Sequence, residues 1–133
     1  MNRSEMREQA FILLYEKEFF KDKPCEEIEE VFAENISELS EYAKETFENV
    51  CERREELDEI ISSYLSGWKI GRLPKVNASI LSLAIYEIKF YSEIPVSVSI
   101  NEAVELAKKY ATKEDASFIN GILSTVAKQN EDE

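Results

Sequence analysis

Histidine is absent from this chain of 133 residues. The usual general base for serine and cysteine nucleophiles is therefore missing, together with the commonest ligand of zinc and di-iron centres. Any catalysis would have to use carboxylates or lysine. We predict that the chain is not an enzyme and that it holds no metal or cofactor.

Cysteine, glycine and proline are scarce. Cys25 and Cys51 do not have the spacing of a metal site and are weak evidence for a disulfide, so we interpret both as ordinary thiols. Three glycines and three prolines leave long uninterrupted stretches. In these stretches apolar residues recur three and four positions apart, which is typical of amphipathic helices. The sequence therefore predicts an all-α fold.

Long apolar runs are also lacking. The N-terminal segment interleaves charged and apolar residues and has no small-residue cleavage site, so it does not resemble a secretory signal. Apolar residues make up 44% of the chain and charged residues 33%, a balance that excludes both a disordered chain and a membrane span. We expect one cytoplasmic domain over residues 1–133.

Positive charge is in short supply, since the formal net charge is −12. Taken alone this value argues against nucleic acid, because binding phosphates requires concentrated positive charge. The acids are unevenly spread, however: residues 26–59 hold 14 acidic and 3 basic side chains, whereas residues 60–75 hold Lys69, Arg72 and Lys75 and no acid. A locally basic surface therefore remains possible outside the acidic block.

About seven helices are predicted from the apolar spacing, with residues 77–88 as the buried central helix because they are apolar nearly all round. Arg53 and Arg54 interrupt the rhythm of a stretch too long for one helix in a small domain, so we place a break at 53–55. The predicted segments are 4–20, 26–36, 39–65 with that break, 77–88, 99–110 and 115–127.

Helix ends are predicted from capping residues. Gly67 is expected to close the segment that ends near residue 65. Asn77, Ser99 (or Ser97) and Asp115 are expected as N-caps of the last three helices, with Asn101 and Glu102 in a first turn.

Three segments together resemble the NusB family. They are Arg7-Glu8-Gln9-Ala10 through Leu14-Tyr15, the central VNASILSLAIYEI at 76–88, and IPVSVSINEAVELAKKYATKEDASFINGIL at 94–123. The last is the most specific, because INEAVELAK is followed at the family's distance by FxNGxL. The resemblance extends from Arg3 to Ala127.

The resemblance implies two three-helix subdomains, which we place at 1–66 and 77–127 around a connector at 67–76 that includes Trp68. Residues 128–133 are expected to form a frayed tail. It also implies a transcription antitermination factor that binds boxA-like single-stranded RNA with the ribosomal protein NusE and so acts indirectly on RNA polymerase. A homodimer is possible, and no membrane contact is expected.

An RNA surface is implied by residues that match the family's basic and helix-opening positions. Arginine suits RNA because its planar guanidinium makes paired hydrogen bonds, and an aromatic ring can stack on an unpaired base. Ala78 and Ser82 stand where the family commonly has basic residues, which makes this surface thinner in charge. The residues assigned to RNA are Arg3, Arg7, Lys69, Arg72, Lys75, Phe118 and Asn120.

Each assignment has a structural alternative. Arg3 and Arg7 could be surface arginines paired along the first helix, and the connector cations could serve only solubility. Phe118 could be a core residue beside Ile122. Gly121 inside a helix suggests close packing or a close ligand.

Tyr15 and Glu87 match positions that face NusE in the family, with a core tyrosine and a solvated glutamate as the alternatives. The acidic runs in 26–59 are interpreted as solvated helix faces. The alternative to an RNA-binding adaptor is a protein-interaction module that binds NusE or itself with little RNA affinity.

Overall fold

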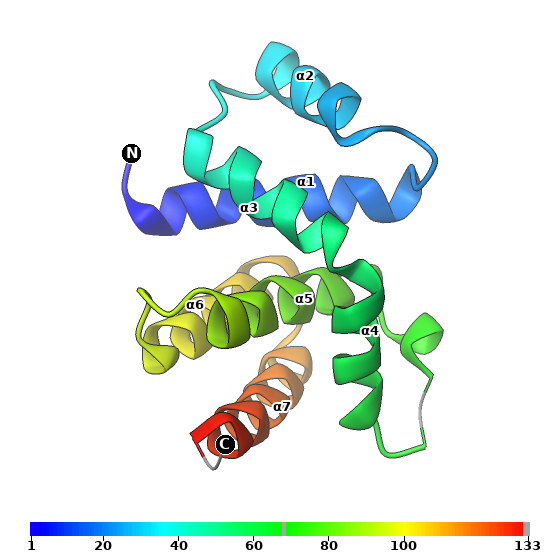
Figure 1. The fold of residues 1–133 in the computed structure, drawn as a ribbon, viewed down its shortest axis with the longest axis vertical. Helices are drawn as coiled ribbons and strands as arrows, with labels where there is room; N and C mark the ends of the chain where they lie inside the picture. Colours follow the sequence, from blue (N-terminus) through cyan, green and yellow to red (C-terminus); the bar gives the residue numbers. More distant parts are fainter. Residues whose placement is uncertain (68, 132–133) are drawn as a thin grey trace. The chain divides into compact units, whose positions relative to one another are not determined.

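The computed structural model describes residues 1–67 and 69–131, and within them it contains seven α-helices and one 3-10 helix and no strand (Figure 1). The all-α prediction is therefore confirmed. The elements are α1 (Arg3–Phe19), α2 (Cys25–Asn35), α3 (Glu41–Glu52), α4 (Arg54–Ser63), η1 (Ile70–Arg72), α5 (Lys75–Phe90), α6 (Val96–Tyr110) and α7 (Lys113–Glu131).

The chain divides into two compact units between Arg53 and Arg54. The first holds α1, α2 and α3. The second holds η1 and four α-helices, because α4 packs against α5. The sequence placed the division later, at a connector spanning 67–76, which lies inside the second unit. Trp68, the expected centre of that connector, is outside the described residues.

In the first unit, α1 contacts both α2 and α3. Its residues Ala10, Leu13 and Leu14 are fully buried, at the three- and four-residue spacing that was predicted for an inner face. The buried side chain of Gln9 fixes the loop before α3: its Nε2 donates to the carbonyl of Glu38 at 2.9 Å, and its Oε1 accepts from the amide of Ser40 at 3.0 Å. A buried amide is thereby satisfied at both ends.

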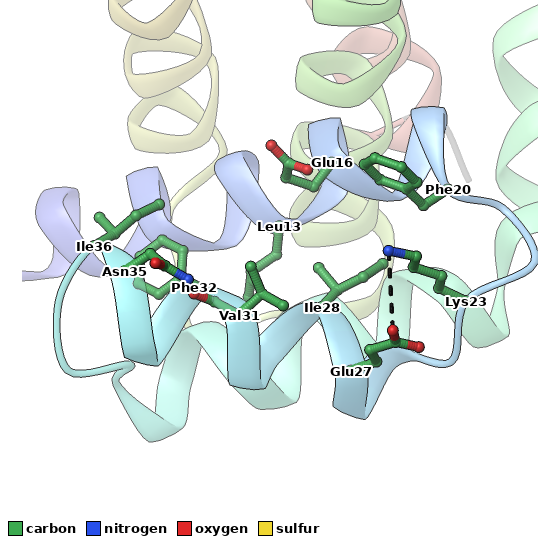
Figure 2. Close-up of a pocket in the computed structure, with 10 residues that line it drawn as sticks. All are labelled: Leu13, Glu16, Phe20, Lys23, Glu27, Ile28, Val31, Phe32, Asn35 and Ile36. Carbon is green, nitrogen blue, oxygen red and sulfur yellow. Dashed lines mark hydrogen bonds and ion pairs between the residues drawn. The ribbon is translucent and has the colours of Figure 1, made fainter.

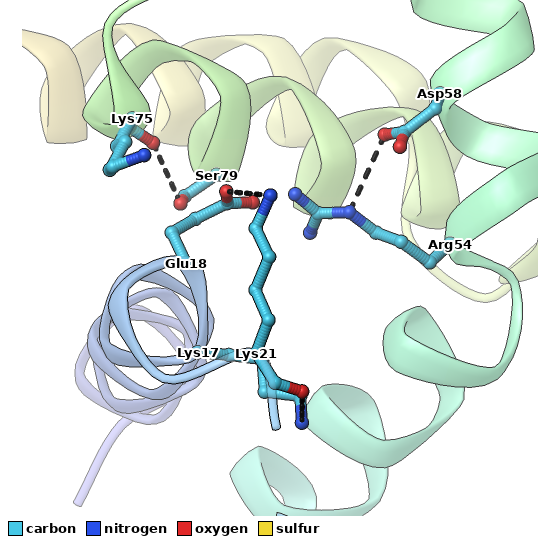
Figure 3. Close-up of polar contacts among 7 residues, drawn as sticks. All are labelled: Lys17, Glu18, Lys21, Arg54, Asp58, Lys75 and Ser79. Carbon is cyan, nitrogen blue, oxygen red and sulfur yellow. Dashed lines mark hydrogen bonds and ion pairs between the residues drawn. The ribbon is translucent and has the colours of Figure 1, made fainter. Parts of the chain in front are cut away.

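The break predicted at 53–55 is confirmed. Helix α3 ends at Glu52 and α4 begins at Arg54, with Arg53 between them at φ −99° and ψ 15°. Arg54 Nε lies 3.4 Å from Asp58 Oδ1, one turn along α4 (Figure 3). Such pairs support a helix modestly.

Helix α4 ends earlier than expected. The amides of Tyr64 and Leu65 donate to the carbonyls of Ile61 and Ser62, which tightens the chain just after Ser63. Gly67 has a φ of 77°, a left-handed conformation that glycine adopts without the penalty of a Cβ atom. It therefore turns the chain beyond the helix and does not cap it directly.

Helix α5 is the central helix of the second unit, as predicted. Every residue from Asn77 to Ile88 is buried, and α5 contacts α4, α6 and α7. A hydroxyl within this apolar helix is satisfied locally, because Ser79 Oγ donates to the carbonyl of Lys75 one turn earlier at 2.8 Å (Figure 3).

All three prolines of the chain are N-caps. Pro24, Pro74 and Pro95 immediately precede α2, α5 and α6, with φ values of −66°, −54° and −57°. Proline suits a helix entrance because its fixed φ is close to helical and its missing N–H is not needed there. The predicted caps Asn77 and Ser99 were therefore wrong, since both lie inside helices. Asn101 and Glu102 likewise lie beyond the first turn of α6.

Helix α7 begins two residues before the predicted cap Asp115. Thr112 precedes it and exchanges hydrogen bonds with Asp115: the Asp115 amide donates to Thr112 Oγ1 at 3.0 Å, and the Thr112 amide donates to Asp115 Oδ2 at 3.2 Å. This reciprocal arrangement is a capping box. The helix continues to Glu131, past residue 128 where the tail was expected to begin. Residues 132–133 are outside the described part of the chain.

No helix in the described residues is long and apolar enough to span a membrane. Within the same residues, no group of three or more acids and cysteines is arranged to hold a metal ion. Cys25 and Cys51 are both free. Burial raises the pKa of the Cys51 thiol, and contact with Cys25 raises it further, so Cys51 is protonated at neutral pH.

Candidate nucleic-acid interface

The connector before α5 carries three exposed cations: Lys69, Arg72 and Lys75. The short helix η1 orders them, because the amide of Arg72 donates to the carbonyl of Lys69 at 2.9 Å. Residues three apart in a 3-10 turn project on the same side. Lys75 begins α5 directly after Pro74. The three predicted positions are therefore accessible, and the turn brings Lys69 and Arg72 together.

The two arginines of α1 differ in exposure. Arg3 is exposed, and its guanidinium lies 4.3 Å from the centroid of the Tyr42 ring on α3. Cation–π contact of this kind orients the guanidinium and leaves its edges accessible. Arg7 is only 2% exposed. The alternative of an ordinary surface arginine is therefore wrong, because α1 turns Arg7 inward, and this burial does not favour its assignment to RNA.

Phe118 lies on the surface of α7, with 41% of the residue exposed. The alternative that it is a core residue beside Ile122 is therefore wrong, and an exposed ring is free to stack on a base. Phe118 was expected at the opening of the last helix, beside its free amides. Because α7 begins at Lys113, Phe118 instead lies past the first turn and away from those amides.

Asn120 is exposed and lies in a groove between α6 and α7. The groove is also lined by Lys108, Lys113, Asn101 and Ser117. Lys108 Nζ lies 3.5 Å from Glu105 Oε1 along α6. Lys108 and Lys113 were not among the predicted site residues, although their positions near the end of α6 and the start of α7 were a usable signal.

Phe118 and Asn120 point in nearly opposite directions, because residues two apart on an α-helix are separated by roughly 200°. Asn120 belongs to the α6–α7 groove, whereas Phe118 projects from the other flank of the buried stripe of α7. The sequence grouped them as one site. In the structure they belong to two surfaces of the same helix.

The start of α5 and the start of α7 are joined by a hydrogen bond. Asn77 Nδ2 donates to Asp115 Oδ1 at 3.0 Å. Hydrogen bonds from Asn77 and Thr112 hold the pKa of the Asp115 carboxyl below its usual value. This bond keeps the helix that Lys75 begins against the first turn of α7, one turn before Phe118.

Gly121 does not serve close packing. It is exposed, and a Cβ atom built there would meet nothing within 4 Å. The neighbouring surface is therefore open on this side of α7. Ala78 and Ser82 were expected at the RNA surface, where the lack of a basic residue at either position would lower the positive charge. Both are buried, so neither position affects the charge of that surface.

The two predicted partner-facing residues also differ. Glu87 is 1% exposed and accepts a 2.9 Å hydrogen bond from Ser99 Oγ, which links α5 to α6. It is neither a solvated glutamate nor an exposed contact. Tyr15 is half-buried, stacked on Phe11 with ring centroids 6.1 Å apart and edge-on to Phe19 at 5.1 Å.

Comparison with known proteins gives a consistent result. The model of the NusB family matches residues 4–128. The chain is 42% identical to the transcription antitermination protein NusB of Lachnoclostridium phytofermentans, over 95% of this chain and 98% of that protein. It is 43% identical to the NusB protein of Acetivibrio thermocellus, over 96% and 90% of the two chains.

Solved structures show the same similarity. A NusB structure from T. maritima matches with a TM-score of 0.85 and 38% identity, covering 96% of this chain and 92% of that one. A structure of the antitermination factors NusB and NusE in complex with double-stranded RNA matches with a TM-score of 0.84 and 32% identity, covering 96% of each chain.

Proposed function

Because this chain belongs to the NusB family, we propose that it is a transcription antitermination factor that binds boxA-like RNA together with the ribosomal protein NusE. One observation carries the proposal: similarity over 96% of both chains to a protein solved with NusE and RNA. Under this proposal the chain acts in the cytoplasm, influences RNA polymerase indirectly and turns over no substrate.

The RNA surface that we propose in the second unit combines the connector with the early turns of α7. Lys69, Arg72 and Lys75 would contact phosphates, and the exposed ring of Phe118 would stack on a base. The Asn77–Asp115 hydrogen bond supports this grouping, since it holds the starts of α5 and α7 together.

Two further RNA contacts are proposed. Asn120, with Lys108 and Lys113 in the α6–α7 groove, would bind a neighbouring part of the strand. Of the two predicted arginines in the first unit, Arg3 is the one available to RNA, because Arg3 is exposed and Arg7 is buried. Tyr15 remains our proposed contact for NusE, whereas Glu87 would support it only through the packing of α5.

The test is fluorescence anisotropy of a labelled boxA-like RNA, with and without NusE, at two salt concentrations. A scrambled single strand and a double-stranded RNA serve as comparisons. We expect tighter binding to boxA-like RNA than to the scramble, stronger binding with NusE, and weaker binding at higher salt because counterions are released on contact with phosphates.

A charge-reversal pair locates the surface. Lys69→Glu with Arg72→Glu should reduce RNA affinity at least tenfold and flatten its salt dependence. Lys128→Glu changes charge on the exposed end of α7 and is the control. If the connector variant binds RNA no more weakly than this control, the connector is not part of the site.

The second candidate is a protein-interaction module that binds NusE with little RNA affinity. It is favoured by the net charge of −12 and by the burial of Arg7, which removes one cation from the predicted surface. Equal and negligible binding to boxA-like and scrambled RNA, even with NusE bound, would establish this alternative.

A further inference from the structure

An apolar groove lies between α1 and α2 in the first unit (Figure 2). Leu13, Ile28 and Phe32 form its buried floor, and its volume is about 310 Å³. That volume is at the lower end of the range for small-molecule pockets. We call this cavity the α1–α2 groove.

Large apolar side chains remain exposed around the α1–α2 groove. Val31 is 52% exposed and Ile36 61%, and Phe20 at the other end of the groove is also exposed. Figure 2 shows these side chains along α2 and at the end of α1, around the same hollow. A contiguous exposed patch of this kind marks an interaction surface more often than a scattered surface residue does.

The rim of the α1–α2 groove is acidic. Glu16 and Glu27 line it, and α2 contains five glutamates and no lysine or arginine. Among the described residues the one cation that lines the groove is Lys23, which lies 3.9 Å from Glu27 and 4.4 Å from the centroid of the Phe20 ring. A partner that covers the groove must therefore combine apolar anchors with positive charge.

The dimensions suit a short helix. Ile28 lies on α2 and Ile36 directly follows its last residue. The eight positions between them correspond to about 12 Å of helix axis, or roughly two turns. An amphipathic helix placed in such a groove contributes apolar side chains three and four positions apart. Its remaining positions would face the glutamates of the rim.

We propose that the α1–α2 groove binds a basic amphipathic helix of a partner protein. A second copy of this chain is a poorer occupant, because its net charge is −12 and the acids of two such rims would repel each other.

The surface is separate from the one proposed for NusE. Leu13 and Tyr15 are two residues apart on α1, so their side chains point roughly 200° apart. The proposal therefore adds a second protein contact on the opposite face of α1, and it does not depend on RNA or NusE binding.

The probe is a dye-labelled amphipathic peptide of about twelve residues, with leucines three and four positions apart and lysines elsewhere. Its controls have the same leucines with glutamates elsewhere, or the same residues in scrambled order. By fluorescence anisotropy at 0.15 M salt, we expect the lysine peptide to bind at least tenfold more tightly than either control. Equal binding of the three peptides overturns the proposal.

Two variants place the bound peptide. Val31→Ser with Ile36→Ser removes exposed apolar surface and should weaken binding at least tenfold without lowering the melting temperature. Glu16→Lys with Glu27→Lys should have a similar effect. The matched control is Glu41→Lys with Glu45→Lys, the same charge change on exposed positions of α3. Wild-type peptide affinity in the groove variants overturns the proposal.

Two further outcomes would also overturn it. Sedimentation velocity that shows a dimer of this chain, abolished by Val31→Ser with Ile36→Ser, would make a second copy the occupant. Competition between NusE and the lysine peptide would assign the groove to NusE. If the wild-type protein binds neither RNA nor NusE, that result counts against the proposed function alone.

Discussion

Asn77 and Asp115 are joined by a 3.0 Å hydrogen bond across 38 residues of sequence. Asn77 lies on α5 and is buried, while Asp115 belongs to the capping box of α7. One carboxylate therefore closes the start of α7 and holds it against α5. The contact joins the helix that Lys75 begins to the helix that carries Phe118, the two sides of the proposed RNA surface.

Asp115→Ala removes the capping box and leaves the Asn77 amide without this acceptor. Losing an N-terminal cap costs about 1 kcal/mol, and an unsatisfied buried donor adds about 1–3 kcal/mol. We expect a loss of about 2 kcal/mol in the free energy of unfolding, measured by urea denaturation at pH 7. Glu114→Ala, at the exposed neighbouring position, should change it by less than about 0.5 kcal/mol.

Acid should remove the contribution of Asp115. Its folded-state pKa is lowered by the hydrogen bonds from Asn77 and Thr112, so this stabilisation is present above the unfolded-state pKa and is lost as pH falls through the folded-state value. The difference in unfolding free energy between wild type and Asp115→Ala should therefore shrink on acidification. A constant difference down to the acid transition would contradict this assignment.

Glu29 should make stability depend on pH in the opposite direction. Burial, followed by a hydrogen bond with Glu48, raises its pKa from 4.5 to about 7. The folded state then binds the proton more tightly than the unfolded state. This stabilisation is complete below the unfolded-state pKa and is lost as pH rises through about 7.

Glu29→Gln removes that titration. The difference in unfolding free energy, variant minus wild type, should be more positive at pH 8 than at pH 5. Glutamine stays neutral at both values, whereas Glu29 is charged at pH 8. Urea denaturation at the two pH values measures the change. Glu30→Gln, at an exposed neighbouring position on α2, is the control. Its unfolding free energy should differ from that of wild type by the same amount at both pH values.

The number and approximate positions of the helices could be predicted from the sequence, but most of their N-cap residues could not. Apolar spacing identified α5 as the buried helix, and the Arg53-Arg54 interruption located the break between α3 and α4. Asn77 and Ser99 were taken for caps because their residue types favour that position. Pro74 and Pro95 occupy the entrances, which left both polar side chains inside helices to bond other helices.

Burial of single charged residues was harder to predict. Arg7 and Glu87 have the composition of surface residues, but their places on α1 and α5 turn them inward. Phe118 shows the reverse, since its apolar character suggested the core although it lies on the flank of α7. Glu87 is buried because α5 is enclosed on all sides, with every residue from Asn77 to Ile88 buried. For Arg7 and Phe118 the outcome depends on which flank of the helix the neighbouring helices cover, and apolar spacing alone does not show this.

Phe118→Ala should weaken binding of boxA-like RNA without destabilising the fold. Stacking of a base on an aromatic ring contributes about 1–3 kcal/mol, so the expected loss is roughly fivefold to a hundredfold. Because 41% of the residue is exposed, the melting temperature should stay within a few degrees. Phe118→Trp should retain affinity for the RNA. Val98→Ala, at an exposed apolar position on α6, is the control for the loss of apolar surface and should leave RNA affinity unchanged.

Arg3 and Arg7 provide the sharpest test of the first-unit assignment. Arg7→Glu places a carboxylate at a position that is 2% exposed, and burying a mismatched charge costs several kcal/mol. We expect its melting temperature to fall strongly and RNA binding to fail through unfolding. Arg3→Glu alters an exposed guanidinium beside Tyr42, so thermal stability should be nearly unchanged while RNA affinity falls severalfold. A stable Arg7→Glu protein with selectively weakened RNA binding would show that Arg7 reaches the RNA after all.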